Sequence, residues 1–338
     1  MARFDLSWEE LRDYRPDVRV PGDFDAFWAR TLAESRAAAD AGGPVIEPAD
    51  TPATAVGLFD VTFPGFAGDP IKAWLALPAG VEPASAGARL PGVVEYLGYG
   101  GGRGLAHTAV GWALAGLAFL LMDTRGQGSG WSPGDTPDPH GSGPAASGVM
   151  TRGIESPATY YYRRLIADAV LAVDALRAVP AVDPARVSVT GTSQGGGLTL
   201  AVAGLVDGLV AACPNVPFLC HFERAVGLTD NQPYAEIRDY LRIHRDRVDQ
   251  TFDTLSYVDG ANFALRATAP ALFSTALEDQ TCPPSTVFAA FNRYGAPGSA
   301  AETDKEIVVY PFNDHEGGAE SHWPRSVAFV RERLARLG

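Results

Sequence analysis

The first group in the sequence that could do chemistry is a serine set among glycines. Ser193 is the centre of Gly191-Thr192-Ser193-Gln194-Gly195, with the apolar run 187–190 before it and a helical stretch over 193–206 after it. This strand–turn–helix context is typical of a nucleophile elbow, whose turn is so tight that side chains two residues either side of the serine would collide. A phosphate-binding loop would need a lysine that is absent at that point. The pattern therefore predicts a nucleophilic role for Ser193.

A nucleophilic serine needs a base to take its proton. In hydrolases built around this turn the chain order is serine, acid, histidine, so the base should lie downstream. His315 follows the apolar run 307–310 in a loop that can reach a strand end, whereas His322 is expected to start the last helix. We therefore predict His315 as the general base.

The acid of such a site should follow the apolar run 270–277, where Glu278 and Asp279 are adjacent. Its role is to fix the imidazole tautomer and to stabilise the imidazolium. Spacing alone separates two neighbouring acids poorly. A loop of a few residues usually precedes an inward-pointing acid, which favours Asp279.

Two backbone N–H groups are expected to hold the oxyanion of an acyl-transfer reaction. One belongs to Gln194, the residue after the nucleophile, and the other to the loop that follows the apolar run 92–97. That loop is Gly98-Tyr99-Gly100-Gly101-Gly102-Arg103-Gly104, whose glycines let the backbone approach a substrate closely. Tyr99 is the best candidate for the second donor; the alternative is an aromatic side chain in a surface turn.

The composition of the chain limits which classes of partner and cofactor are expected. The 338 residues carry a formal net charge of −13, and an acidic chain gains nothing from a phosphate backbone, so no nucleic acid is expected. Three cysteines without a CxxC pair or a zinc-type cluster predict neither a disulfide framework nor a metal site. The start lacks the apolar segment of a signal peptide, and the longest apolar stretch, 109–122, is too short to span a bilayer. We expect a cytoplasmic protein that needs no cofactor and no membrane.

The elements that must position these groups alternate between strands and helices. Helical stretches, clearest over 160–179, separate short runs that are largely apolar and do not alternate, as in parallel strands buried on both faces. Together they predict an α/β fold with a mostly parallel central sheet flanked by helices, in a single domain over 1–338. The predicted strands of this sheet cover 92–97, 117–122, 187–190, 270–277 and 307–310.

Other regions are expected outside this alternation. Residues 1–40 form an N-terminal helical extension, and the β-like runs 56–63 and 71–77 form a hairpin at an edge of the sheet. The stretch 131–157, rich in Gly, Pro, Ser and Asp, is a long loop. Residues from about 214 to 265 are a cap-like insertion over the strand ends, where ligands bind in such folds. The alternative for both long segments is a plain surface loop.

Taken together, these motifs resemble the acetyl xylan esterase and cephalosporin-C deacetylase family (carbohydrate esterase family 7), which has the α/β-hydrolase fold. Arg125-Gly126-Gln127, Gly191-Thr192-Ser193-Gln194-Gly195 and His315-Glu316 resemble the family's RGQ, GxSQG and HE motifs. The oxyanion loop and Cys282-Pro283-Pro284 after the acid agree as well, so the resemblance covers essentially the whole chain. One departure is Gly100, which stands where members often have Asn.

The resemblance implies roles for the residues that match these motifs. It implies Ser193, Asp279 and His315 as the catalytic triad, which decides between the adjacent acids. It also implies Tyr99 and Gln194 as the oxyanion donors.

Further properties follow only from the resemblance. Arg125 and Gln127 would be structural groups near the site, and the substrates would be small acetylated xylose oligomers and cephalosporin C. Members are typically intracellular homo-oligomers, often hexamers, in which the loop 131–157 would help to form subunit contacts.

Two other functions stay open on the residues alone. A carboxylesterase or thioesterase for other acyl chains would use the same triad. A catalytically silent hydrolase fold would instead act as a binding or scaffold protein. The preference for acetyl over longer chains rests on the resemblance and not on any pocket visible in the sequence.

Overall fold

One nine-stranded sheet forms the centre of the part of the chain that the structure, a computed structural model, describes: residues 4–39, 43–140, 148–295 and 303–337. The strand order across the sheet is β1-β2-β3-β5-β4-β6-β7-β8-β9. In chain order the strands are β1 (Val45–Pro48), β2 (Gly57–Pro64), β3 (Pro70–Leu77), β4 (Leu90–Tyr96), β5 (Ala118–Met122), β6 (Val182–Thr192), β7 (Ala212–Asn215), β8 (Ala271–Ala276) and β9 (Lys305–Tyr310).

Neighbouring strands from β5 to β9 across the sheet pair in parallel, while β1, β2, β3 and β5 pair antiparallel. The predicted mostly parallel sheet is thus confirmed, and the predicted hairpin is β2 and β3, close to one edge. The carboxyl ends of the parallel strands lie along the same edge, so the loops that follow them can meet.

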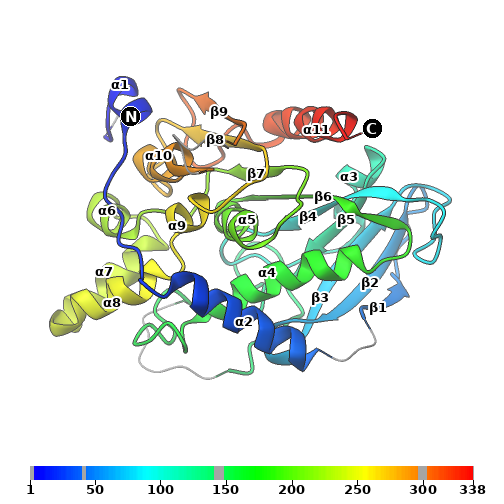
Figure 1. Cartoon of the computed structure of the whole chain (residues 1–338), viewed down its shortest axis with the longest axis horizontal. Coiled ribbons are helices and arrows are strands. Elements are labelled where there is room, and N and C mark those ends of the chain that lie inside the picture. Colours follow the sequence, from blue (N-terminus) through cyan, green and yellow to red (C-terminus); the bar gives the residue numbers. More distant parts are fainter. Residues whose placement is uncertain (1–3, 40–42, 141–147, 296–302, 338) are drawn as a thin grey trace.

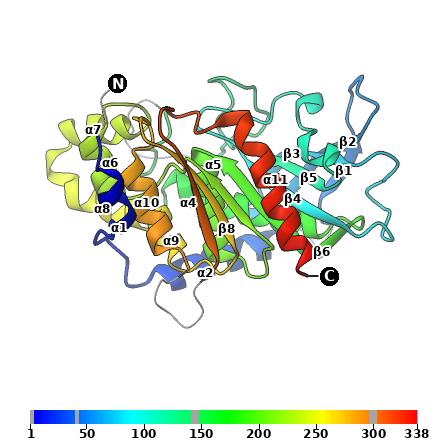
Figure 2. The same cartoon turned by 90° about the horizontal axis from the view of Figure 1, so that it is seen from above.

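Helices cover both faces of the sheet (Figures 1 and 2). In the views, α2, α4 and α5 lie on one face, and α3 and α11 lie on the other. The helices are α1 (Trp8–Asp13), α2 (Phe24–Ala38), α3 (Gly111–Leu114), α4 (Tyr161–Arg177), α5 (Gln194–Leu205), α6 (Phe222–Leu228), α7 (Tyr234–Ile243), α8 (Val248–Ser256), α9 (Gly260–Ala264), α10 (Pro284–Arg293) and α11 (Ala319–Ala335).

The apolar runs of the parallel strands follow from this two-sided packing. Successive side chains of a strand point to opposite faces. Val94 and Leu120 join the core that α4 and α5 complete, whereas their neighbours Val93 and Phe119 join the core that α3 and α11 complete. Because both faces are buried, these strands are largely apolar and do not alternate, although polar residues such as Glu95 in β4 and Ser274 in β8 interrupt them.

The sequence analysis does not predict β1 and β7. Strand β7 contains Pro214, and proline, which has no N–H to donate, is normally absent from central strands. Its pairs with β8 flank the proline, at Ala212 and Asn215. The first residues of the expected insertion, from about 214 to 265, thus belong to the end of this strand. The insertion's helices α6 to α9 lie between β7 and β8 in the chain.

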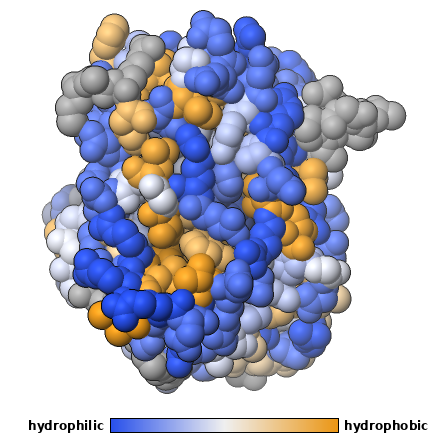
Figure 3. Space-filling model, turned by 90° about the vertical axis from the view of Figure 1, so that its left-hand side faces the viewer, coloured by the Kyte–Doolittle hydropathy of each residue, from blue (hydrophilic) through white to orange (hydrophobic). Residues whose placement is uncertain are grey.

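Helices α6, α7 and α8 lie at the left of Figure 1, on the side that Figure 3 views face-on. On that side, groups of apolar residues are interrupted by hydrophilic ones (Figure 3). The expected loop 131–157 holds no helix or named strand in its described part; residues 141–147 lie outside the described residues. None of the described helices is both long enough and apolar enough to traverse a lipid bilayer.

Candidate active site

Ser193 occupies a strained turn between β6 and α5. Its φ of 59° and ψ of −116° lie in a region that residues with a side chain rarely adopt. The surrounding backbone holds the turn: the Ser193 N–H donates to Asn215 O at 2.9 Å, and Ser193 O accepts from the N–H groups of Gly197 and Phe218. The turn therefore projects the serine from the carboxyl end of a central strand.

The glycines around Ser193 are required by close backbone contacts. A Cβ on Gly195 would lie 2.0 Å from Tyr96 O, and one on Gly191 would lie 2.5 Å from the backbone of Gly195. Both distances are far below any contact that a carbon atom tolerates. The steric reason predicted for the glycine pattern is confirmed.

Three of the predicted site residues form one hydrogen-bonded chain. His315 Nε2 lies 2.9 Å from Ser193 Oγ, and His315 Nδ1 lies 2.9 Å from Asp279 Oδ2. Asp279 is fully buried, and its second oxygen accepts from the N–H groups of Thr281 (2.8 Å) and Cys282 (2.7 Å). These two donors hold the carboxyl group in place, with its other oxygen facing the imidazole.

The rival residues lie elsewhere. The acid that hydrogen-bonds to His315 is Asp279, while the backbone N–H of the adjacent Glu278 donates to Asn313 O. His322 belongs to α11, where its Nδ1 lies 2.9 Å from Tyr310 Oη. Burial lowers the pKa of His322 to about 4.

The loop after β4 forms a tight turn next to the elbow. The Gly101 N–H donates to Gly98 O, which places Tyr99 and Gly100 at the two central positions. Gly100 has a φ of 79°, a value that glycine and, less readily, asparagine adopt. The departure from the family pattern at Gly100 therefore keeps the turn. Gln194 is the first residue of α5, so its N–H has no acceptor within its own helix.

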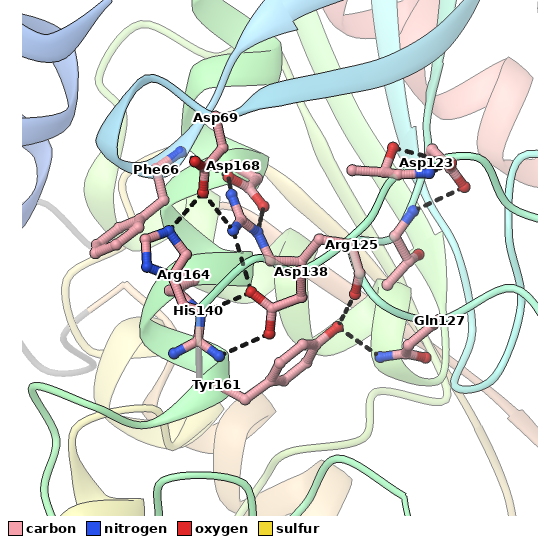
Figure 4. Close-up of polar contacts among 12 residues, drawn as sticks. Phe66, Asp69, Asp123, Arg125, Gln127, Asp138, His140, Tyr161, Arg164 and Asp168 are labelled. Atoms are coloured by element: carbon pink, nitrogen blue, oxygen red, sulfur yellow. Dashed lines mark hydrogen bonds and ion pairs between the residues drawn. The ribbon is translucent and has the colours of Figure 1, made fainter. Parts of the chain in front are cut away.

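Gln127 connects the two sides of this arrangement. Its Oε1 accepts from the Gly100 N–H at 2.6 Å, and its Nε2 donates to Gln194 Oε1 at 2.8 Å. The same Nε2 lies 3.0 Å from Tyr161 Oη, which in turn donates to the carbonyl oxygen of Arg125 at 2.6 Å (Figure 4). Gln127 thus fixes the loop after β4 relative to the start of α5.

Arg125 is the centre of a closed ionic cluster (Figure 4). Its guanidinium is fully buried and donates to Asp168 (2.8 Å), Asp69 (2.9 Å) and Asp138 (3.4 Å). His140 Nε2 contacts Asp69 at 2.6 Å. Burial by itself would lower the pKa of Arg125, but Asp168, with Asp69 and Asp138, raises it above its usual value. Arg125 stays charged and has no proton to exchange.

The sequence analysis does not single out Glu236 of α7, which anchors Tyr99. Tyr99 Oη donates to Glu236 Oε1 at 2.7 Å and accepts from the Val149 N–H at 2.8 Å. The Met150 N–H donates to Glu236 Oε2 at 3.1 Å. Burial raises the pKa of Glu236, which these hydrogen bonds counteract. No local pattern could reveal this contact, because 137 positions separate the two residues.

A pocket of about 420 Å³ lies above Ser193 and His315. Trp131, 63% exposed, forms part of its wall, and its Nε1 donates to Tyr99 O at 2.8 Å. The sequence places Trp131 only in a long loop. The remaining lining residues are Gly98, Thr192, Gln232, Pro233 and Thr281.

Asp279, Cys282 and His315 are the one group in the described part of the chain whose ligand-type atoms gather as for a metal ion, within 4.8 Å of one another. Cys282 is fully buried, and burial raises the pKa of its thiol well above the usual value. The thiol therefore stays protonated, while metal binding would need the thiolate. The Asp279–His315 hydrogen bond suits acid–base chemistry better than a metal centre.

Comparisons with known proteins agree with this geometry. The family model described as acetyl xylan esterase (AXE1) matches residues 1–333. The solved structure of an acetyl xylan esterase from Paenibacillus sp. R4 is 36% identical, with a TM-score of 0.88 over 97% of this chain and 99% of that one.

Two further relatives extend the comparison. Acetyl xylan esterase 1 from Thermoanaerobacterium sp. JW/SL YS485 is 31% identical, with a TM-score of 0.86 over 98% of this chain and 99% of that one. Acetyl esterase Axe7A from Xylanibacter ruminicola is 30% identical over 177 residues, which are 52% of this chain but only 38% of that longer protein.

Proposed function

The chain belongs to the acetyl xylan esterase family of carboxylic ester hydrolases, and from that membership we propose that it removes acetyl groups from acetylated xylo-oligosaccharides through an acetyl-Ser193 intermediate. The observation that carries the proposal is the hydrogen-bonded chain from Asp279 through His315 to Ser193 Oγ, with 2.9 Å at both steps. These three hydrogen-bonded side chains lie under a pocket that can admit an ester.

The first half of the reaction acylates the enzyme. The Nδ1–H of His315 donates to Asp279, which leaves Nε2 as the acceptor for the Ser193 proton. Ser193 Oγ attacks the acetyl carbonyl carbon as His315 takes that proton. The N–H groups of Tyr99 and Gln194 hold the resulting oxyanion. The C–O bond to the sugar then breaks, and the sugar alcohol leaves with the proton from His315.

The second half releases acetate. His315 takes a proton from a water molecule, which attacks the acetyl carbon, and the same two N–H groups hold the second oxyanion. Ser193 leaves as its hydroxyl receives the proton back from His315. The original Ser193 proton has left with the sugar alcohol and a proton of the water replaces it, so the enzyme is restored and the cycle consumes one ester and one water.

The test is acetate release from acetylated xylo-oligosaccharides by the wild type and by Ser193→Ala, with p-nitrophenyl octanoate as the contrast. We expect release by the wild type only, with octanoate cleaved poorly. Efficient octanoate cleavage would favour an esterase or thioesterase for longer chains. Absence of Ser193-dependent hydrolysis, together with failure of a fluorophosphonate probe to label Ser193, would favour a scaffold protein.

Cephalosporin C is the second proposed substrate, because its acetyl ester needs the same chemistry and the sequence resembles that family. Acetate release from cephalosporin C by the wild type but not by Ser193→Ala would support it. We also propose a cytoplasmic location and a homo-oligomer such as a hexamer. Light scattering of the purified protein would test the oligomer, and a monomeric mass would contradict it.

A further inference from the structure

A second pocket lies directly beside the one above Ser193. It has a volume of about 390 Å³, and Thr192 lines both pockets. The proposed mechanism uses none of its characteristic side chains. They come from the ends of β4 and β7, from α3 and from the start of α11: Glu95, Asn215, Trp112, His322, Trp323 and Ser326.

Helix α11 supplies both the floor and the rim of this pocket. One helical face carries residues spaced i, i+3, i+4 and i+7, and this is the spacing of Ala319, His322, Trp323 and Ser326. His322 and Ser326 are only 3% and 2% exposed, whereas Trp323 is 39% exposed. The pocket is therefore buried at His322 and Ser326 and open to solvent at Trp323.

Buried polar atoms at this pocket lack a hydrogen-bond partner among the described residues. His322 Nε2 and Asn215 Oδ1 are buried without a hydrogen bond to any described residue. The contact with Tyr310 fixes the His322 ring through Nδ1, and its low pKa of about 4 keeps the ring neutral at pH 7. A buried polar group without a partner is unfavourable, so such atoms mark the place of a polar ligand.

The chemistry of the walls suits a neutral ligand rich in hydroxyl groups. Glu95 accepts from Trp112 Nε1 at 3.2 Å, and like Asn215 Oδ1 its carboxylate offers acceptors to hydroxyl donors. The rings of Trp112 and Trp323 meet edge to face at 5.9 Å and form an aromatic wall. The C–H face of a sugar packs on such a surface while its hydroxyls donate to the polar groups. The exposed Glu316 disfavours an anion, while burial raises the pKa of Glu95 to about 7.

We propose that this second pocket binds an unacetylated sugar residue of the same oligosaccharide whose acetyl ester reaches Ser193. The inference rests on the proposed function, which it extends by naming how a chain of sugars is held. The shared residue Thr192 makes the two pockets neighbours, so adjacent sugar residues can occupy them together. An acetylated oligosaccharide then gains a contact that a small acetyl ester does not have.

Binding of unacetylated xylotriose, measured by calorimetry, tests the pocket without any turnover. We expect the wild type to bind and Trp323→Ala to bind about tenfold more weakly, because an aromatic contact of this kind is worth on the order of 1 kcal/mol or more. Trp8→Ala is the matched control, since Trp8 has the same exposed fraction of 39% but packs against Phe288 of α10. Equal binding by Trp323→Ala, or none by the wild type, would overturn the proposal.

Kinetics separate this inference from the function on which it rests. For Trp323→Ala and Glu95→Gln we expect kcat/KM on acetylated xylotriose to fall about tenfold, with kcat/KM on p-nitrophenyl acetate nearly unchanged. An equal fall of kcat/KM on both substrates would indicate a structural role for these residues and would overturn the proposed sugar site. If the wild type hydrolyses neither substrate, the proposed function fails, while xylotriose binding still decides the pocket.

Discussion

Two regions of this molecule set a buried aspartate against a nitrogen-containing side chain, and they differ in what that side chain can do. At the elbow, Asp279 faces His315, whose side chain is 31% exposed beneath a pocket. In the ionic cluster, Asp168 faces Arg125, whose side chain has no exposed surface. Asp279 and Asp168 are equally buried, so burial of the acid does not separate the two regions.

The difference lies in the mobility of a proton. An imidazole gains and loses a proton near neutral pH, and its second nitrogen is free to serve a nucleophile. A guanidinium among three carboxylates keeps its charge, so the cluster can only hold structure. Contact between an acidic and a basic residue is therefore not enough to indicate catalysis. The basic group must also be able to give up its proton, lie within hydrogen-bond distance of a nucleophile and face a pocket.

The largest expected effect is the loss of the nucleophile. Ser193→Ala should lower kcat on the order of 10⁴-fold or more, because no other group can form the acyl intermediate. The free energy of unfolding should change little, since alanine keeps the same backbone. Steady-state kinetics and urea unfolding check both. Full turnover by the purified Ser193→Ala protein would mean that the region around Ser193 is no more catalytic than the ionic cluster.

A second change probes the acid. Asp279→Asn should lower kcat by roughly 10³- to 10⁴-fold, because an amide can donate to Nδ1 and hold His315 in the wrong tautomer. The matched control is Glu278→Gln, the neighbouring acid, for which we expect little change. If the two variants lost activity equally, the assignment of the acid would be wrong.

In the ionic cluster we expect a loss of stability instead of rate. Arg125→Met leaves buried carboxylates without their cation and should cost about 3–5 kcal/mol in the free energy of unfolding. Arg12→Met, at an arginine whose side chain is 61% exposed, should cause no measurable change. Urea unfolding and kcat per titrated active site provide the readouts. A stable Arg125→Met protein without turnover would place Arg125 in the chemistry.

The smallest expected effect is for Gln127, which lies between the ionic cluster and the turn that holds Ser193. Gln127→Met removes the hydrogen bonds to the Gly100 N–H and to Gln194, so the two proposed oxyanion donors, Tyr99 and Gln194, lose their alignment. We expect kcat to fall roughly 10- to 100-fold with a smaller change in KM. Gln250→Met, at an exposed glutamine bonded to Glu155 O, is the control. A rise in KM alone would indicate a role in substrate binding.

Local patterns were enough for part of this account. The glycines around Ser193 follow from one tight turn, and the order of strands and helices follows from apolar runs. Strand β7 was missed because it is four residues long and contains Pro214, which argues against a central strand. The choice between Glu278 and Asp279 depends on which side chain turns inward, and spacing does not encode that.

Contacts between distant segments could not be predicted. Tyr99 meets Glu236 across 137 positions, and the pocket wall combines Trp131 with residues of five other segments. The second pocket arises only when α11 packs beside the ends of β4 and β7. Such sites depend on the folded arrangement of the chain, and a single sequence without its structure does not specify them.

The most direct test of the central claim is to trap the acyl-enzyme. Wild type mixed with p-nitrophenyl acetate is quenched in acid within the first turnover and digested, and the peptide containing Ser193 is analysed by mass spectrometry. We predict one acetyl group on Ser193 in the wild type and none in Ser193→Ala. Acetate release with an unmodified Ser193, or with the acetyl group on another residue, would contradict the account.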